Sequence, residues 1–108
     1  MVNRFRVEEA EASAFLTELR AALAALAGKR GYVDGRIGRN VDDPALWVLT
    51  MRWENVGSYR RALSSYDVKL NAVPLLSRAV DEPSAYELVE DEATLNVALP
   101  RSGPGNPD

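Results

Sequence analysis

The fold is decided by residues 45–72, which read ALWVLTMRWENVGSYRRALSSYDVKLNA. Strand-forming residues dominate Leu46 to Trp53, and Asn55 then opens a stretch in which Tyr59 and Leu63 lie one helical turn apart. Because Ser64 to Tyr66 interrupts that period, the segment predicts a strand, a tight turn and a helix that breaks. A strand that passes directly into a helix is a natural place for a ligand pocket.

The chain before this segment predicts a strand, a helix and a second strand. Residues 2–7 alternate with the period of a strand, and the two faces carry Val2, Arg4 and Arg6 on one side and Asn3, Phe5 and Val7 on the other. An apolar stripe at helical spacing follows, formed by Phe15, Leu19, Ala22, Leu23 and Leu26. Tyr32 to Val41 reads as a strand in which Gly35 and Gly38 indicate a bulge or a close backbone approach.

The chain after this segment predicts the rest of a broken helix and one more strand of the sheet. Asp67 to Ala79 resumes the helical period weakly, and Ala85 to Glu90 forms a fourth strand with Tyr86 and Leu88 on one face. Residues 1–90 then form one domain, and residues 91–108 are an extension with a peripheral strand at Thr94 to Leu99 and a frayed tail. The order of elements predicts an α+β, ferredoxin-like split βαβ fold with a four-stranded antiparallel sheet and helices on one face.

Strands one and three offer apolar residues to both faces of this sheet, although the helices cover only one. An exposed apolar sheet is an aggregation hazard or an interface. We therefore expect a symmetric homodimer in which two sheets meet face to face.

Composition excludes several classes of function. The chain has 108 residues, a net charge of −3, and basic residues scattered among acids, which argues against a nucleic-acid partner. It has neither histidine nor cysteine, so catalytic triads, ordinary metal sites and the usual haem ligand are not expected. No apolar run approaches the ~20 residues of a membrane span, and the N-terminus has no apolar signal core. We expect a cytoplasmic protein without a membrane partner.

The chain resembles a known family. The pattern Asn3-Arg4-Phe5 on the first strand, Gly31-Tyr32 at the start of the second, and Trp53-Glu54 at the end of the third is similar to antibiotic biosynthesis monooxygenase (ABM) domains over residues 2–89. The resemblance implies a dimeric α/β barrel with a pocket in each subunit between the sheet and its helices. It also implies oxidation of polycyclic aromatic substrates by dioxygen without a cofactor or, in a related branch, oxidative degradation of haem.

The two branches make different demands on the sequence. The haem-degrading branch uses an asparagine on the first strand, a tryptophan on the second helix and a histidine as iron ligand. Asn3 matches the first position, but the other two fall on Ala62 and near Ala72. The quinone-forming branch positions a phenol-like substrate with Asn, Trp, Tyr and Arg side chains and needs no metal or flavin. We therefore expect a monooxygenase acting on an aromatic or quinol-like small molecule.

Seven residues are candidates for this site. Asn3 and Tyr66 are the catalytic candidates, and the substrate-binding candidates are Phe5, Arg52, Trp53, Tyr59 and Asp67. Simpler roles stay open: Asn3 could be satisfied by backbone, Trp53 could serve packing, and Asp67 could cap the next helical segment. A noncatalytic binding or structural protein that keeps the fold is the alternative function. No metal or cofactor is expected in either case.

Overall fold

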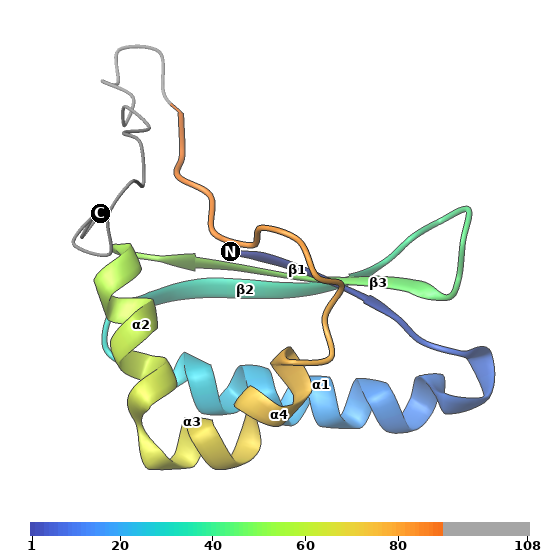
Figure 1. The fold of residues 1–108 in the computed structure, drawn as a ribbon, viewed down its shortest axis with the longest axis horizontal. Coiled ribbons are helices and arrows are strands. Elements are labelled where there is room, and N and C mark those ends of the chain that lie inside the picture. The colour runs from blue at the N-terminus through green and yellow to red at the C-terminus, as the bar shows by residue number, and fades with distance from the viewer. Residues whose placement is uncertain (90–108) are drawn as a thin grey trace.

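The computed structural model describes residues 1–89 of the chain. Along the chain lie β1 (Val2–Arg6), the 3-10 helix η1 (Glu9–Glu11), α1 (Ala12–Ala27), β2 (Tyr32–Arg39), β3 (Leu46–Trp53), α2 (Val56–Ser64), α3 (Tyr66–Asn71) and α4 (Val73–Leu76). The sheet forms one layer, α1, α3 and α4 lie against one of its faces, and α2 stands at one end (Figure 1). This arrangement confirms the α+β, ferredoxin-like class.

The sheet has the order β1-β3-β2, with both pairs antiparallel. Phe5 lies opposite Trp47 in the β1–β3 ladder, and Asn3 lies opposite Leu49. These four side chains are buried beneath the helices, whereas Arg4 on the other face is only half-buried. The alternation predicted for the first strand is therefore confirmed.

Gly35 of β2 allows the close packing of α1. A register shift places a bulge between Tyr32 and Asp34. A Cβ atom on Gly35 would lie 2.7 Å from Cδ1 of Leu23, so the absence of a side chain lets α1 approach the strand. β2 pairs only with β3 among residues 1–89, and its Arg36 and Arg39 are exposed.

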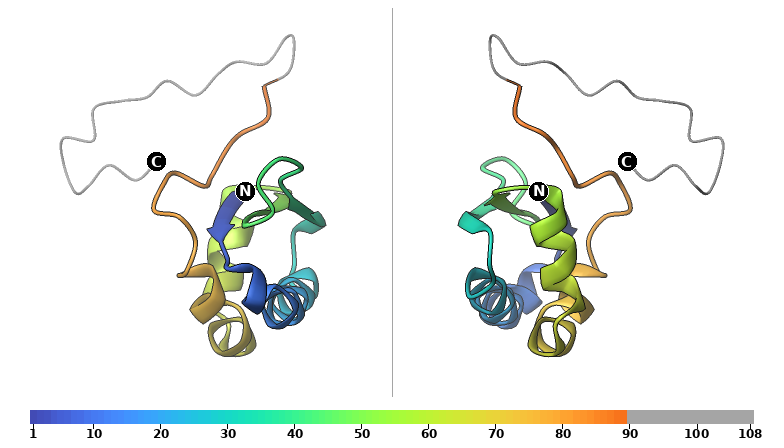
Figure 2. Two further views of the ribbon diagram at one scale, coloured as in Figure 1. Left: turned by 90° about the vertical axis from the view of Figure 1, so that its right-hand side faces the viewer. Right: turned by 90° about the vertical axis from the view of Figure 1, so that its left-hand side faces the viewer.

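The end-on views show the sheet and the helices as separate layers (Figure 2), and the hydrophobic core lies between them. The predicted stripe on α1 supplies its centre, since Phe15, Leu19, Ala22 and Leu26 are buried, with Leu23 half-buried at the margin. Each fully buried large side chain contributes about 1.5–3 kcal/mol relative to exposure. α1 therefore fixes the position of the sheet through this one face.

The predicted break in the second helix is confirmed at Ser65. Its backbone is extended, with φ −75° and ψ 151°, and separates α2 from α3. The hydroxyl of Ser65 donates to the carbonyl of Ala62 at 2.7 Å, which closes the last turn of α2. Beyond the break, Val68, Ala72 and Leu75 are buried in the core.

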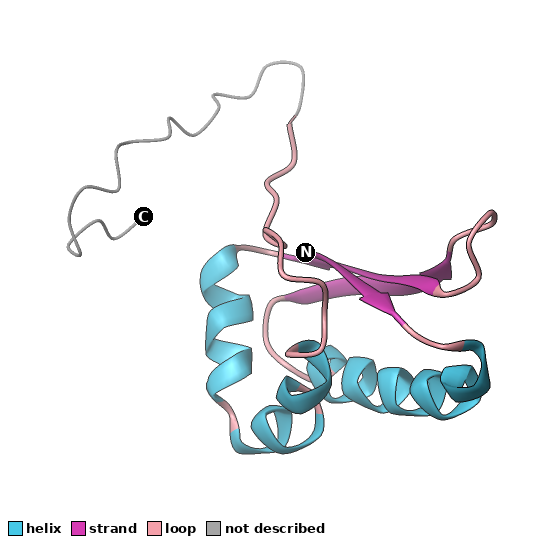
Figure 3. Ribbon diagram, turned by 45° about the vertical axis from the view of Figure 1, so that its right-hand side comes forward, coloured by secondary structure: helices cyan, strands magenta, loops and turns pink. Residues whose placement is uncertain are grey.

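The predicted fourth strand, Ala85 to Glu90, is wrong for residues 85–89. The sheet has three strands among residues 1–89, and residues 85–89 leave its body as a loop with Tyr86 66% and Leu88 70% exposed (Figure 3). Alternation gave these residues the pattern of a strand, but no strand within residues 1–89 pairs with them. Glu90 and the strand predicted at Thr94 to Leu99 lie outside the described residues.

An irregular segment, residues 80–84, occupies the border of β1 instead. The N–H of Val80 donates to the carbonyl of Arg4, and the N–H of Val2 donates to that of Ser84, both at 2.7 Å. The guanidinium of Arg4 also binds both carboxylate oxygens of Glu82 at 2.7 Å. These contacts hold the segment antiparallel to β1, although it lacks the regular ladder of a strand.

The outer face of the sheet mixes aliphatic and basic side chains. Val2, Leu46, Val48 and Thr50 are half-buried there.

Within residues 1–89, every helix is too short or too polar to cross a bilayer.

Candidate active site

Three polar atoms on the helix-facing side of the sheet are buried without a partner among the described residues. They are Oδ1 of Asn3 and the indole Nε1 atoms of Trp47 and Trp53. Asn3 is 9% exposed on β1, and both tryptophans project from the same face of β3. A buried polar group left unpaired costs about 1–3 kcal/mol. These three atoms are therefore candidates for hydrogen bonds to a bound ligand.

Aromatic rings surround this layer in two groups. At one end, Phe15 packs against Phe5 and Trp47, with ring centroids 5.2 and 5.7 Å apart. At the other end, Trp53 packs edge-on against Tyr32 and Tyr59 at 5.4 and 5.5 Å. Asn3, opposite Leu49, lies on the stretch of sheet between the two groups. The layer therefore offers aromatic walls with an amide between them.

The tyrosines at the Trp53 end stay protonated at neutral pH. Burial raises the pKa of Tyr59, and burial together with the nearby charge of Asp34 raises the pKa of Tyr32. Because both hydroxyls keep their protons, they serve as hydrogen-bond donors and not as bases.

The start of α2 is fixed by a capping arrangement. The side chain of Asn55 accepts from the N–H of Ser58 at 2.8 Å and from its hydroxyl at 3.1 Å. Gly31 has φ +91°, and a Cβ atom there would collide with Cβ and Oγ of Ser58. The carbonyl of Gly31 also accepts from the N–H of Glu54 at 2.7 Å. α2 is thus held directly against the turn that joins α1 to β2.

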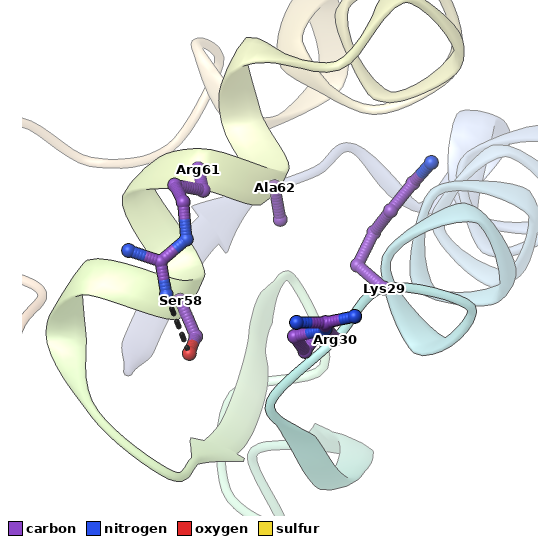
Figure 4. A pocket seen from close by; sticks show the side chains of 5 residues that line it. All are labelled: Lys29, Arg30, Ser58, Arg61 and Ala62. Carbon is purple, nitrogen blue, oxygen red and sulfur yellow. Dashed lines mark hydrogen bonds between the residues drawn. The ribbon is translucent and has the colours of Figure 1, made fainter.

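A surface depression of about 300 Å³ lies beside this contact. Figure 4 shows it between α2 and the α1–β2 turn, and its lining residues are Lys29, Arg30, Ser58, Arg61 and Ala62. A second depression of about 260 Å³ lies where β2 and β3 approach their connecting loop, and its lining includes Arg4, Arg39, Trp47 and Val48. Arg39 lies over the ring of Trp47, 5.1 Å from its centroid.

Four of the seven predicted site residues share the layer between sheet and helices. Asn3, Phe5, Trp53 and Tyr59 all face this layer, and Phe5 and Tyr59 are buried. The structure thus groups the β1 and β3 candidates with the first turn of α2.

The other three lie elsewhere. Arg52 is on the outer face of the sheet, 3.4 Å from Asp34, because neighbours in a strand point to opposite faces and Trp53 points inward. Tyr66 is 79% exposed at the start of α3. Asp67 is half-exposed and binds Lys29 at 2.7 Å, and this hydrogen bond lowers the pKa of the carboxyl group. Beneath the break between α2 and α3, Val68 and Ala72 are fully buried in the core.

Sequence reasoning missed the residues of the depression at α2. None of Lys29, Arg30, Ser58 and Arg61 was among the seven candidates. The available signal was a pair of basic dipeptides, Lys29-Arg30 and Arg60-Arg61, on either side of the two strands predicted at Tyr32 to Val41 and Leu46 to Trp53. Among residues 1–89 no cluster of three or more acidic side chains forms a metal site.

Comparison with known proteins identifies relatives of this architecture. Residues 1–70 match the family model described as antibiotic biosynthesis monooxygenase. The structure is similar to SnoaB, a cofactor-independent oxygenase from Streptomyces nogalater, at 28% identity and a TM-score of 0.64, covering 87% of this chain and 92% of SnoaB. A search of curated proteins found no match.

Two more distant structures share the fold. Rv0793 from Mycobacterium tuberculosis matches with a TM-score of 0.65 and 17% identity, covering 85% of this chain and 95% of its own. A conserved protein from Methanosarcina mazei matches with a TM-score of 0.63 and 19% identity, covering 78% of this chain and 82% of its own.

Proposed function

Because the chain belongs to the antibiotic biosynthesis monooxygenase family, we propose that it is a cofactor-independent monooxygenase acting on an aromatic or quinol-like small molecule. The observation that carries the proposal is the unpartnered Oδ1 of Asn3, buried between two groups of aromatic rings. The likeness to SnoaB, a cofactor-independent oxygenase, supports the class of reaction.

In this proposal Asn3 orients the substrate. Its Oδ1 accepts a hydrogen bond from a phenolic hydroxyl, which satisfies the orphaned acceptor. The indole N–H of Trp53 donates to a substrate oxygen on which negative charge develops. Since the pKa of Tyr59 is raised by burial, its hydroxyl also serves as a donor and does not remove the substrate proton.

The redox balance requires only the substrate and dioxygen. A benzylic CH₂ group activated by a phenol loses a proton, and its carbanion reacts with dioxygen. One oxygen atom becomes a new carbonyl oxygen and the other leaves as water, because the CH₂ carbon supplies four electrons and two protons. The residues contribute orientation and charge stabilisation, and the closed layer excludes water.

The experiment is oxygen uptake by the full chain with a tricyclic phenol that carries such a CH₂ group. The substitution Asn3→Leu keeps a side chain of similar size and removes the acceptor. We expect a fall in kcat of about 100-fold, the order that a misoriented substrate costs. Tyr66→Phe is the control and should leave the rate unchanged, since Tyr66 is 79% exposed.

Thermal stabilisation separates the two functional classes. If the phenol raises Tm of the wild type but no oxygen is consumed, the protein is a binding protein and not an oxygenase. If the phenol neither raises Tm nor reacts, the proposal fails.

We also propose that two copies pair through the outer face of the sheet, as proteins of this family typically dimerise. The half-buried Val2, Leu46 and Val48 supply apolar area on that face. Val48→Asp would place a charge at its centre, so light scattering should show the monomer for this variant and the dimer for the wild type. A wild-type monomer at micromolar concentration would refute the assignment.

A further inference from the structure

The depression at the start of α2 has an excess of positive charge. Lys29, Arg30 and Arg61 line it, and the one carboxylate in contact with these cations among residues 1–89 is Asp67, which binds Lys29 at 2.7 Å. This hydrogen bond lowers the pKa of the Asp67 carboxyl group. Three cationic side chains therefore face one carboxylate.

Arg30 and Arg61 have no acidic partner within the described part of the chain. Arg61 makes one weak contact, from Nη2 to the hydroxyl of Ser58 at 3.4 Å, and Arg30 makes no ion pair. The other arginines that line a depression differ, since Arg4 binds Glu82 and Arg39 donates to the carbonyl of Pro44. Guanidinium groups bind carboxylate and phosphate through two parallel hydrogen bonds. Arg30 and Arg61 make no such pair of bonds within residues 1–89, so their donors are available to an anionic ligand.

The depression is built on a rigid frame. Gly31 contacts Ser58 directly, Asn55 caps α2 through Ser58, and Lys29 ties the turn to α3 through Asp67. The elements that carry Arg30 and Arg61 are therefore fixed relative to each other, which lowers the entropic cost of binding a ligand between them.

The walls of the depression are apolar as well as basic. The methyl group of Ala62 projects from α2 towards the turn that carries Lys29 and Arg30 (Figure 4). The aliphatic stems of the three cationic side chains add further apolar surface. A volume of about 300 Å³ is at the lower end of the range for small-molecule sites, about 300–1,000 Å³. The chemistry thus fits a small organic anion better than a bare inorganic one.

We propose that this depression binds the carboxylate or phosphate group of a small organic molecule between Arg30 and Arg61, with the organic part against Ala62. Lys29 adds charge from the side, and its bond to Asp67 holds it at the rim. The site does not depend on the oxygenase proposal, because its three cationic residues lie outside the layer around Asn3.

Isothermal titration calorimetry of the full chain tests the site at constant ionic strength. The probes are benzoate, phenyl phosphate, inorganic phosphate and benzyl alcohol. We expect benzoate, phenyl phosphate or both to bind, with benzyl alcohol silent and inorganic phosphate at least tenfold weaker. Which organic probe binds more tightly identifies the anionic group. Inorganic phosphate binding as tightly as both organic probes would overturn the organic assignment, and no binding by either organic probe would overturn the site.

Charge-removing variants locate the binding. Arg30→Gln and Arg61→Gln should each raise Kd for the better probe at least tenfold. Arg20→Gln is the matched control, because Arg20 is exposed on α1 and does not line the depression. Equal weakening by all three variants would show diffuse attraction and refute the site. Circular dichroism confirms that each variant is folded, and oxygen uptake need not be measured.

Amide chemical shifts give an independent readout in the wild type. Titration with the better probe should move the amides of residues 28–31 and 56–62. Shifts confined to other segments would place the anion elsewhere and contradict the proposal.

Discussion

Replacing Gly31 with alanine tests the contact that holds the start of α2 against the α1–β2 turn. With φ +91°, Gly31 has a conformation that costs a residue with a side chain about 1–2 kcal/mol. The new Cβ atom would also collide with Cβ and Oγ of Ser58. Moving Ser58 away would break its two hydrogen bonds to Asn55, and loss of an N-cap costs about 1 kcal/mol.

These terms together predict that Gly31→Ala lowers the free energy of unfolding by about 2–3 kcal/mol. Urea unfolding followed by circular dichroism measures the change. With a slope of about 1–3 kcal/mol per molar urea, the midpoint should fall by about 0.7–3 M while the slope stays constant.

Gly28→Ala provides the matched control three residues away. Gly28 has φ −82°, and a Cβ atom there would meet only the carbonyl oxygen of Ala25 at 3.8 Å, an ordinary contact. This change should be neutral or stabilising by up to about 1 kcal/mol, because alanine restricts the unfolded chain. If Gly31→Ala costs no more than Gly28→Ala, the argument from backbone strain and collision is refuted.

A double variant separates the two causes. Ser58→Gly removes both atoms with which the new Cβ collides, so it should recover the collision part of the loss in the Gly31→Ala background. The strain from the positive φ should remain. Full recovery would mean that the backbone conformation costs nothing, and no recovery would mean that the collision is relieved elsewhere.

Three further predictions concern the candidate sites. Asn3→Leu should raise the free energy of unfolding by about 1–3 kcal/mol, because it removes a buried acceptor without a partner; a loss of stability in urea would show that Asn3 is satisfied by a group of the protein. Asp67→Asn should destabilise the protein at neutral pH and not at low pH. The lowered pKa of Asp67 contributes stability above the unfolded pKa of about 3.9, and this stability is lost as pH falls through the folded value. Equal stabilities of the variant and the wild type at pH 7 would show that the bond to Lys29 contributes nothing. Tyr66→Phe should change stability by less than about 0.5 kcal/mol, whereas Tyr59→Ala should cost about 3–5 kcal/mol by opening the core; thermal unfolding of both variants distinguishes these effects.

The elements that bury an apolar face could be predicted from the sequence. The alternation of residues 2–7 predicts which side chains of β1 face the helices. The stripe on α1 predicts which side chains of that helix face the sheet, and the structure confirms both. The break at Ser65 was also visible, because consecutive serines interrupt the helical period there. In each case the pattern lies in neighbouring residues of the sequence, and any similar packing of sheet and helices would bury the same side chains.

The fourth strand failed because strand pairing is not local. Tyr86 and Leu88 alternate as strand residues do, yet a strand exists only beside a partner. The border of β1 is occupied by residues 80–84, which are held there by two backbone hydrogen bonds and by the ion pair of Arg4 with Glu82, 78 positions apart in sequence. Nothing in the composition of residues 80–84 indicated that role.

Only some of the candidate site residues could be placed correctly from the sequence. Asn3 and Trp53 could be assigned to the inner face by counting alternate residues from the apolar pattern. The same count places Arg52 on the outer face of the sheet. Arg52 was therefore a candidate because of its residue type and not because of its position. The direction of the Tyr66 side chain depends on the angle between α2 and α3. That angle is set by the packing of Val68 and Ala72 and has no sequence signature.

The two borders of the sheet have a consequence for how copies of this protein can associate. Residues 80–84 cap the border of β1, and the border of β2 presents a bulge, two glycines and the charged Arg36 and Arg39. Features of this kind prevent strands of separate molecules from joining edge to edge into a continuous ribbon. A concentrated solution of the chain should therefore resist fibril formation through these 89 residues, and the pairing of sheet faces that we propose would end at a closed pair.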